Sequence, residues 1–234
     1  MDKYEGPQIN GKRHGKGVYQ WATGNRYEGE FKDGNMDGKG MFFYENGDKY
    51  EGDIVCNLQQ GYGIYIGKEF MYEGEWFEGL MHGRGKYRSL VDGSVYEGEV
   101  VKGVRHGHGT WTYEDPDGVK HHYRGEYKNH RKDGYGKYMV SKTNESDSNE
   151  SKKTDSNEYE GGFLMDLMHG KGVYVNGNGD IYNGHFKYGK RHGHGIMVLA
   201  DGSIFDGLFE NDAMVPNKGM LSPSIKSKHS SQSI

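Results

Sequence analysis

The sequence predicts an all-β fold: an elongated, twisted antiparallel sheet of about eight stacked β-hairpins and a partial ninth. Three observations predict it. Glycine fills 40 of the 234 positions, more than twice the usual ~7%. Alanine occurs only three times and leucine eight times, so the commonest helix-forming residues are nearly missing. A motif of about 23 residues recurs along almost the whole chain, and such periodicity is typical of stacked repeats.

The repeat begins with an aromatic residue that is followed two positions later by glycine. With this aromatic residue at offset 0, glycine occupies offset +2 in all nine units and offsets +11 and +13 in the first eight. The interval between units varies from 22 to 36 residues, whereas these offsets do not vary. The nine starting residues are Tyr4, Tyr27, Tyr50, Tyr72, Tyr96, Tyr123, Tyr159, Tyr182 and Phe205.

Each unit has the alternation of two short strands. In the fourth unit, Tyr72–Trp76 places Tyr, Gly and Trp on one face, and Gly83–Tyr87 repeats this pattern after a turn near Gly79. Rings recur on that face at offsets 0, +4 and +15, beside glycines on which they can lie flat. One hairpin alone is marginal in water, so the units must stack. Four units lack the glycine usual at offset +7, which predicts altered turns there: Asn57, His130, Asp166 and Asp212.

The repeat divides the chain into four segments. Residues 1–140 hold six repeats, and residues 159–219 hold the seventh, the eighth and a partial ninth that is expected to cap the array. Residues 141–158 between them carry three lysines, five acidic residues and no aromatic side chain, which predicts a disordered polar insert. The serine-rich, basic tail at 220–234 is also predicted to be disordered.

Composition excludes several classes of protein. The longest apolar run, Ile196–Ala200, is far shorter than the ~20 residues that span a bilayer, and the first ten residues contain no signal-peptide segment. Cys56 is the only cysteine, so an internal disulfide is excluded and a reducing, cytoplasmic compartment is expected. A net charge of −4 and a pI of about 6.3 provide no broad basic field for nucleic acid.

The pattern resembles the MORN (membrane occupation and recognition nexus) repeat family. Tyr72–Gly93 is most similar to the family consensus, and the resemblance extends from Tyr4 to about Met220. Proteins built of MORN repeats alone resemble axonemal components such as radial spoke head proteins, and also cortical cytoskeletal scaffolds. The resemblance therefore implies a scaffold in the cytoplasm, on the cytoskeleton, with the axoneme of a cilium or flagellum favoured. Its implied partners are axonemal or cytoskeletal protein subunits, and self-association is left open.

Four features are similar to catalytic or ligand sites. Five of the 12 histidines share offset +10, where each is expected to hydrogen-bond a turn instead of a metal: His14, His82, His106, His169 and His192. The glycine-rich stretches enter strands and lack the phosphate-loop pattern. The acidic residues at offset +1, beginning with Glu5 and Glu28, form a ladder expected to pair with basic residues across strands. Lone Cys56 is expected to be an inert thiol. We expect neither enzymatic activity nor a cofactor or metal.

The ring row at offset +4 is the predicted partner-binding site. Large rings along a curved sheet provide a groove for an extended or helical peptide, although the same rings also have glycines to pack on. The predicted residues are Phe31, Trp76, Tyr127, Phe163 and Phe186. A second class, a peripheral membrane protein that binds phosphoinositides, rests on basic clusters such as Lys190–His192, but the net negative charge predicts weak binding or none. The third class is the targeting module of a lipid kinase or lysine methyltransferase, and the repeats leave no segment for such a catalytic domain.

Overall fold

The computed structural model describes residues 1–143 and 154–216, and these contain twenty β-strands and no helix. The prediction of an all-β fold of stacked hairpins is confirmed. The chain divides into two compact units, Met1–Arg131 and Lys132–Ile234, and each is described by itself.

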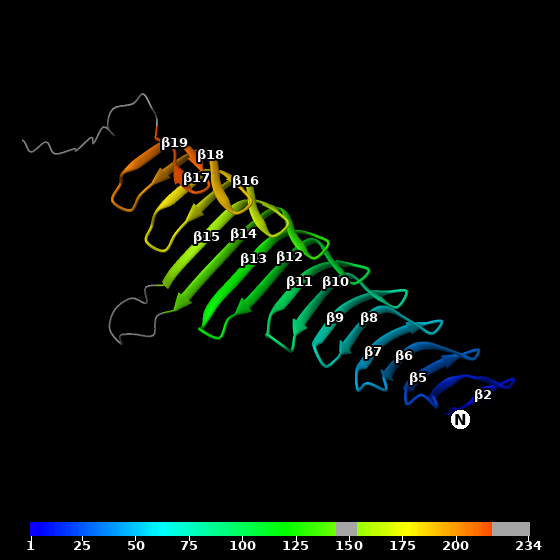
Figure 1. Ribbon diagram of the computed structural model, residues 1–234. Helices are drawn as coiled ribbons and strands as arrows, with labels where there is room; N and C mark the ends of the chain where they lie inside the picture. The colour runs from blue at the N-terminus through cyan, green and yellow to red at the C-terminus, as the bar shows by residue number, and fades with distance from the viewer. Residues whose placement is uncertain (144–153, 217–234) are drawn as a thin grey trace, which may run out of the picture. The chain divides into compact units, whose positions relative to one another are not determined.

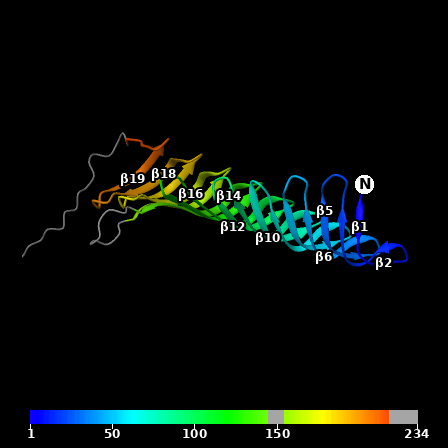
Figure 2. The same ribbon diagram turned by 90° about the horizontal axis from the view of Figure 1, so that it is seen from below.

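In the first unit, the strands follow one another in an antiparallel meander (Figure 1). Neighbouring hairpins lie side by side in both views, and the strands twist along the unit (Figure 2). A short separate ribbon of β2 and β3 replaces the tip of the first hairpin, where Pro7 interrupts the strand. The strands are β1 (Lys3–Glu5), β2 (Gln8–Ile9), β3 (Lys12–Arg13), β4 (Gly15–Gln20), β5 (Arg26–Lys32), β6 (Asn35–Phe43), β7 (Lys49–Val55), β8 (Leu58–Ile66), β9 (Phe70–Phe77), β10 (Leu80–Ser89), β11 (Val95–Val101), β12 (Val104–Glu114) and β13 (Val119–Lys128).

The second unit has the same arrangement of antiparallel neighbours, from β14 to β20. Its last strand within the described residues, β20, is only two residues long. The strands are β14 (Arg131–Thr143), β15 (Thr154–Leu164), β16 (Leu167–Val175), β17 (Ile181–Lys187), β18 (Lys190–Val198), β19 (Ile204–Glu210) and β20 (Ala213–Met214).

The flanks of the predicted polar insert belong to the sheet. Ser141 pairs with Ser156 and Thr143 with Thr154, so β14 and β15 extend beyond the boundaries 141–158 that the sequence predicted. The pairing continues into these polar residues because the preceding residues of β14 and β15 are already paired, from Gly134 with Phe163 onward. The rest of the insert, 144–153, and the tail from 217 lie outside the described residues.

The glycine rows make room for the tyrosine at offset 0. The Tyr72 hydroxyl donates to the Glu75 carbonyl at 3.0 Å, which holds the ring across the glycines at +2 and +13. A methyl group at Gly85 would lie within 3.0 Å of that ring. The predicted packing of rings on glycine is confirmed, and it recurs along the chain. The fully buried tyrosines are Tyr27, Tyr50, Tyr72, Tyr96, Tyr123, Tyr159 and Tyr182.

The two-residue turns within the hairpins are uniform, and the prediction of altered turns at offset +7 is wrong. Both central residues have positive φ whether or not glycine is present, as in Glu78–Gly79 (50° and 80°) and Cys56–Asn57 (48° and 70°). This is the backbone of a type I′ turn, which Asn and Asp tolerate better than other side chains. The residue type changes while the turn stays the same.

A second ladder of hydrogen bonds joins these turns to the preceding repeat. The +7 N–H donates to the carbonyl at +9 of the preceding repeat, for example Gly79 to Gln59 at 2.9 Å. Where Asn or Asp replaces glycine, its side-chain oxygen also accepts from the N–H at that +9 position: Met36 N–H donates to Asn57 Oδ1 at 2.9 Å. Asp166 and Asp212 accept in the same way from Lys132 and Arg191. The substitution therefore adds at least one bond between repeats, and Asn57 adds a second by donating its Nδ2 to Asn35 Oδ1 at 2.8 Å.

We expect Asn57→Ala to lower the free energy of unfolding by about 2 kcal/mol. It removes two side-chain hydrogen bonds, one accepted from the Met36 N–H and one donated by Asn57 Nδ2 to Asn35 Oδ1 at 2.8 Å, together worth about 1 kcal/mol. It also forces alanine into a left-handed conformation at a further cost of about 1 kcal/mol. The matched control Asn57→Gly removes the same two bonds without the conformational cost, so its loss should be about half as large. Urea denaturation measures both. Equal losses for the two variants would contradict the role given to backbone conformation.

Candidate functional site: the aromatic face of the first unit

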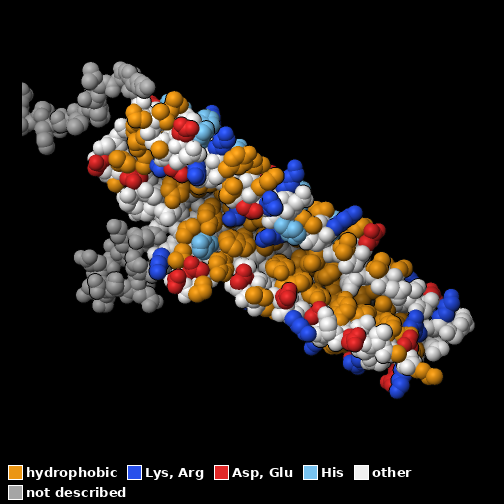
Figure 3. All heavy atoms as spheres, in the orientation of Figure 1, with side chains coloured by type: hydrophobic (Ala, Val, Ile, Leu, Met, Phe, Trp, Pro, Cys, Tyr) orange, Lys and Arg blue, Asp and Glu red, His pale blue; other side chains and the backbone are white. Residues whose placement is uncertain are grey.

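The rings at offset +15 and their neighbours lie half-buried on the face that also carries the buried tyrosines. We call this surface the aromatic face. Its rings touch in sequence: the Tyr19 and Trp21 centroids are 4.6 Å apart, and the Phe70 and Tyr87 rings stack at 4.8 Å. Figure 3 shows hydrophobic side chains gathered in a hollowed band along the exposed strands. The half-buried rings of this row are Tyr19, Trp21, Phe42, Tyr44, Tyr65, Phe70, Tyr87, Trp111 and Tyr113.

A hollow of about 420 Å³ opens on this face over β10 to β12. Rings from offsets 0 and +15 form its apolar lining, among them Tyr87 and Trp111, together with Met81 and Val100. Its polar side chains are Arg105, His130, Asp92 and two serines, and polar groups share its lining about equally with apolar groups. A concave site that combines rings with oriented polar groups can hold a ligand or peptide. We call it the Arg105 hollow.

Arg105 differs from the other two arginines at offset +9. The Arg13 guanidinium donates to the Gly34 carbonyl at 2.7 and 3.1 Å, and Arg191 donates to the Asp212 side chain and carbonyl at 3.3 and 3.2 Å. The corresponding turn residue for Arg105 is His130, which supplies no carboxylate. Among the described residues, the Arg105 guanidinium contacts the Tyr96 and Tyr127 rings, each at 5.6 Å, and makes no side-chain hydrogen bond or ion pair.

Of the acidic and histidine side chains in the hollow, one is charged and the other is neutral. Hydrogen bonds from Ser89 and Ser94 lower the pKa of Asp92, so this carboxylate at the rim is charged. Partial desolvation and the charge of Arg105 lower the pKa of His130, so its imidazole is neutral at pH 7. The hollow therefore contains one cation, Arg105, with one anion at its edge.

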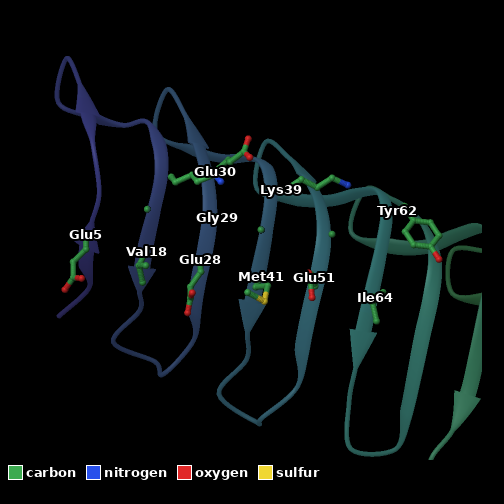
Figure 4. Close-up of a pocket in the computed structure, with 14 residues that line it drawn as sticks. Glu5, Val18, Glu28, Gly29, Glu30, Lys39, Met41, Glu51, Tyr62 and Ile64 are labelled. Carbon is green, nitrogen blue, oxygen red and sulfur yellow. The ribbon is translucent and has the colours of Figure 1, made fainter.

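A wider hollow of about 960 Å³ lies on the opposite face of β1 to β8. Glutamates alternate there with apolar residues across directly paired strands, Glu28 beside Met41 and Glu51 beside Ile64 (Figure 4). Glu28 and Glu51 lie two strands apart, about 10 Å, and Glu28 and Glu30 lie on one strand, so the glutamates form a row instead of a single pair. Lys39 pairs with Asp53 at 2.6 Å. This surface has the character of a solvated polar face.

The ladder of acidic residues pairs only in part as predicted. Lys86 lies 3.8 Å from Glu97 and Lys137 lies 3.9 Å from Glu160, both across strands, whereas Glu28 pairs with Arg26 of its own strand. Glu73 instead accepts from the Tyr62 hydroxyl at 2.7 Å. The Cys56 thiol is exposed, with its sulfur 3.9 Å from Asp37 Oδ2.

Two of the five +10 histidines hydrogen-bond turns as predicted, whereas the buried Nδ1 of His14 has no hydrogen-bond partner within the described part of the chain. His82 Nδ1 accepts from the Lys102 N–H at 3.4 Å, and His169 Nδ1 accepts from the Tyr188 N–H at 3.5 Å. In other repeats the same position carries Asp or Gln in the same role; Gln60 Oε1, for example, accepts from the Glu78 N–H at 3.1 Å. In residues 1–143 and 154–216, no group of three His, Cys, Asp or Glu side chains could hold a metal ion.

The rings predicted to bind a partner are core residues. Each lies edge-on against an offset-0 tyrosine, and most lie between two of them; Trp76, for example, lies 5.0 Å from Tyr50 and 5.5 Å from Tyr72. Because these rings are enclosed by their own sheet, they support the aromatic face without forming its surface. That assignment is corrected here for all five, whose exposed fractions are Phe31 3%, Trp76 8%, Tyr127 4%, Phe163 6% and Phe186 5%.

Sequence reasoning missed the surface residues of the hollow, although one signal pointed to them. Offset +9 lies on the same face as offsets +13 and +15, and it carries Met in four of the nine repeats but Arg or Lys in four others. A cation at an otherwise apolar position is a candidate for function. Arg105 follows from that signal together with the structure of its neighbouring turn.

The geometry is that of a repeat array whose stacked hairpins expose one apolar face. The MORN repeat model matches residues 9–26, 27–49, 50–68, 72–89, 96–115, 123–139, 159–181 and 182–204. These matches cover more than half of the chain, which belongs to the MORN repeat family. No curated protein matches the chain significantly.

Members of this repeat family are modules that contact proteins or membranes, and the repeat itself is non-catalytic. Within the part of the chain that the structure describes, there is no helix with the length and apolar character needed to traverse a bilayer.

Proposed function

We propose that this protein is a non-catalytic scaffold that binds protein partners through the aromatic face. We propose that it acts in the cytoplasm as part of the cytoskeleton, either in the axoneme of a cilium or flagellum or at the cell cortex. The axoneme is favoured because proteins built of MORN repeats alone resemble radial spoke head proteins. The observation that carries the proposal is the hollow beside Tyr87 and Trp111, where half-buried rings remain open to a partner.

Two features support a protein as the occupant. Aromatic residues and arginine are enriched in the cores of protein interfaces, and both line the Arg105 hollow. The rings are also fixed by the sheet, so a partner loses little of its binding energy to ordering them. A stacked array of this kind provides an extended surface on which a partner segment can lie.

The membrane alternative has less support. Two arginines of its basic clusters, Arg13 and Arg191, have guanidinium groups that donate to neighbouring turns. Arg13 also lies 4.5 Å above the Tyr19 ring. These charges are therefore engaged with the sheet, and a net charge of −4 provides little attraction to an anionic leaflet.

We expect Trp111→Thr to reduce capture of native partners about 30-fold, because a central aromatic anchor is worth about 2 kcal/mol. The tagged full chain is captured from ciliated cells, and co-purifying proteins are quantified by mass spectrometry. The matched control is Ile66→Thr, which removes an exposed apolar side chain from the opposite face and should change capture less than twofold. Circular dichroism confirms folding of both variants. Unchanged capture by folded Trp111→Thr would contradict the proposal.

The composition of the captured set tests the cellular assignment. Axonemal or cortical cytoskeletal subunits support it. Co-sedimentation with phosphoinositide vesicles at 0.15 M salt tests the alternative, and strong retention there would favour the membrane class over the scaffold.

A further inference from the structure

We propose that the Arg105 hollow is a specific subsite for a carboxylate that a partner protein carries beside an apolar side chain. The inference rests on the proposed function and names the chemistry of the partner. The carboxylate would occupy the position opposite the guanidinium, and the neighbouring apolar group would lie against Tyr87, Trp111 and Met81.

The first argument is the missing acceptor of Arg105. At the same offset, Arg13 and Arg191 each donate twice to the following turn. Arg105 is half-buried between rings, and its guanidinium has no hydrogen-bond acceptor among the described residues. A partly desolvated guanidinium without an acceptor is costly, and a bidentate carboxylate is the acceptor whose geometry it matches best.

The second argument is the context of that cation. The rings and Met81 around it form an apolar lining large enough for a side chain, with a volume of about 420 Å³. An apolar lining with one oriented charged group selects a ligand that has both characters. Desolvation by the bound apolar group would strengthen the interaction between guanidinium and carboxylate.

The third argument separates a carboxylate from a phosphoinositide headgroup. A headgroup with several phosphates requires several cations, whereas the hollow has Arg105 alone. His130 is neutral, and the charged Asp92 at the rim repels a multiply charged anion. The single positive charge therefore matches one carboxylate.

The test uses two small probes of the same shape, 3-phenylpropionate and its neutral amide, 3-phenylpropionamide. Nuclear magnetic resonance of the full chain follows the Nε–H signal of Arg105 and the indole N–H of Trp111. We expect the carboxylate to bind at least tenfold more tightly than the amide and to shift both signals. Equal affinities, or shifts elsewhere with none at Arg105, would overturn the proposal.

The chain itself provides the variants. The variant Arg105→Met should fold, because methionine already occupies offset +9 in other repeats, at Met36, Met81 and Met168. It should abolish the preference for carboxylate over amide, whereas the matched control Arg13→Met should retain it. A preference that persists in Arg105→Met would show that another cation binds the probe, and the proposal would fail. If inositol trisphosphate binds the wild-type protein more tightly than 3-phenylpropionate does, the carboxylate proposal is wrong and the hollow is a lipid headgroup site.

A second experiment tests whether the hollow recognises a carboxylate within a polypeptide. Peptides that bind the protein are selected from a random twelve-residue display library. We expect wild-type protein to enrich peptides with Asp or Glu next to an aromatic or leucine residue, and Arg105→Met to lose only the acidic preference. Absence of the acidic preference on wild-type protein would overturn the inference. Partner capture that depends on Trp111 but not on Arg105 would leave the proposed function standing and reject this subsite alone.

Discussion

Gly85→Ala should lower the free energy of unfolding by about 3 kcal/mol, near the upper end of the usual cost of overpacking. The added methyl group would lie within 3.0 Å of the Tyr72 ring and hydroxyl. The ring has no easy escape, because its hydroxyl is held by the Glu75 carbonyl and Trp76 packs against it at 5.5 Å. Urea denaturation followed by circular dichroism measures the loss.

The matched control is Gly93→Ala, in the turn that follows the same strand. Gly93 has a φ of 73° and no heavy atom within 4 Å of the added methyl position, so only the left-handed conformation, at about 1 kcal/mol, opposes alanine. If the two variants lose the same stability, contact between ring and glycine is not what makes glycine necessary at offset +13. If Gly85→Ala loses clearly more, the packing explanation holds.

Alkali should unfold the protein cooperatively between pH 10 and pH 12. Burial raises the pKa of Tyr27, Tyr72, Tyr96 and Tyr159 to about 12, whereas a tyrosine in the unfolded chain has a pKa of about 10. A raised pKa contributes stability that is fully present below pH 10 and is lost as pH rises through 12. Each shift of about two units corresponds to about 3 kcal/mol, and four such residues together approach the whole stability of a typical domain.

Absorbance of tyrosinate and far-ultraviolet circular dichroism, recorded on one sample, test this expectation. The buried tyrosines should ionise only as the sheet signal disappears. Tyr72→Phe should make the pH dependence less steep, because one titrating group is removed. Ionisation of these tyrosines near pH 10 with the sheet intact would contradict the prediction.

Offsets and alternation were enough to predict the hairpin, the stacking and the role of glycine. Gly85 and Tyr72 are thirteen residues apart, and a regular hairpin of that length places them on one face. The histidine row could also be interpreted from sequence, because a residue that recurs at one offset belongs to the repeat. The MORN family resemblance followed from the same offsets.

The depth of each ring was decided only by the tertiary structure. Alternation places Trp76 and Tyr87 on the same face, but Trp76 lies between two tyrosines and donates its indole N–H to the Gly63 carbonyl at 3.1 Å, whereas Tyr87 remains half-buried beside the hollow. The pairing within the repeat shifts between Met81 and Gly85, so the +4 ring sinks against the preceding repeat. Sequence by itself determined the fold and the face of each ring, whereas the uniform backbone of the turns without glycine was shown only by the structure. Which rings and which arginine remain open depends on contacts between repeats, because burial is set by neighbours that the period of one repeat does not describe.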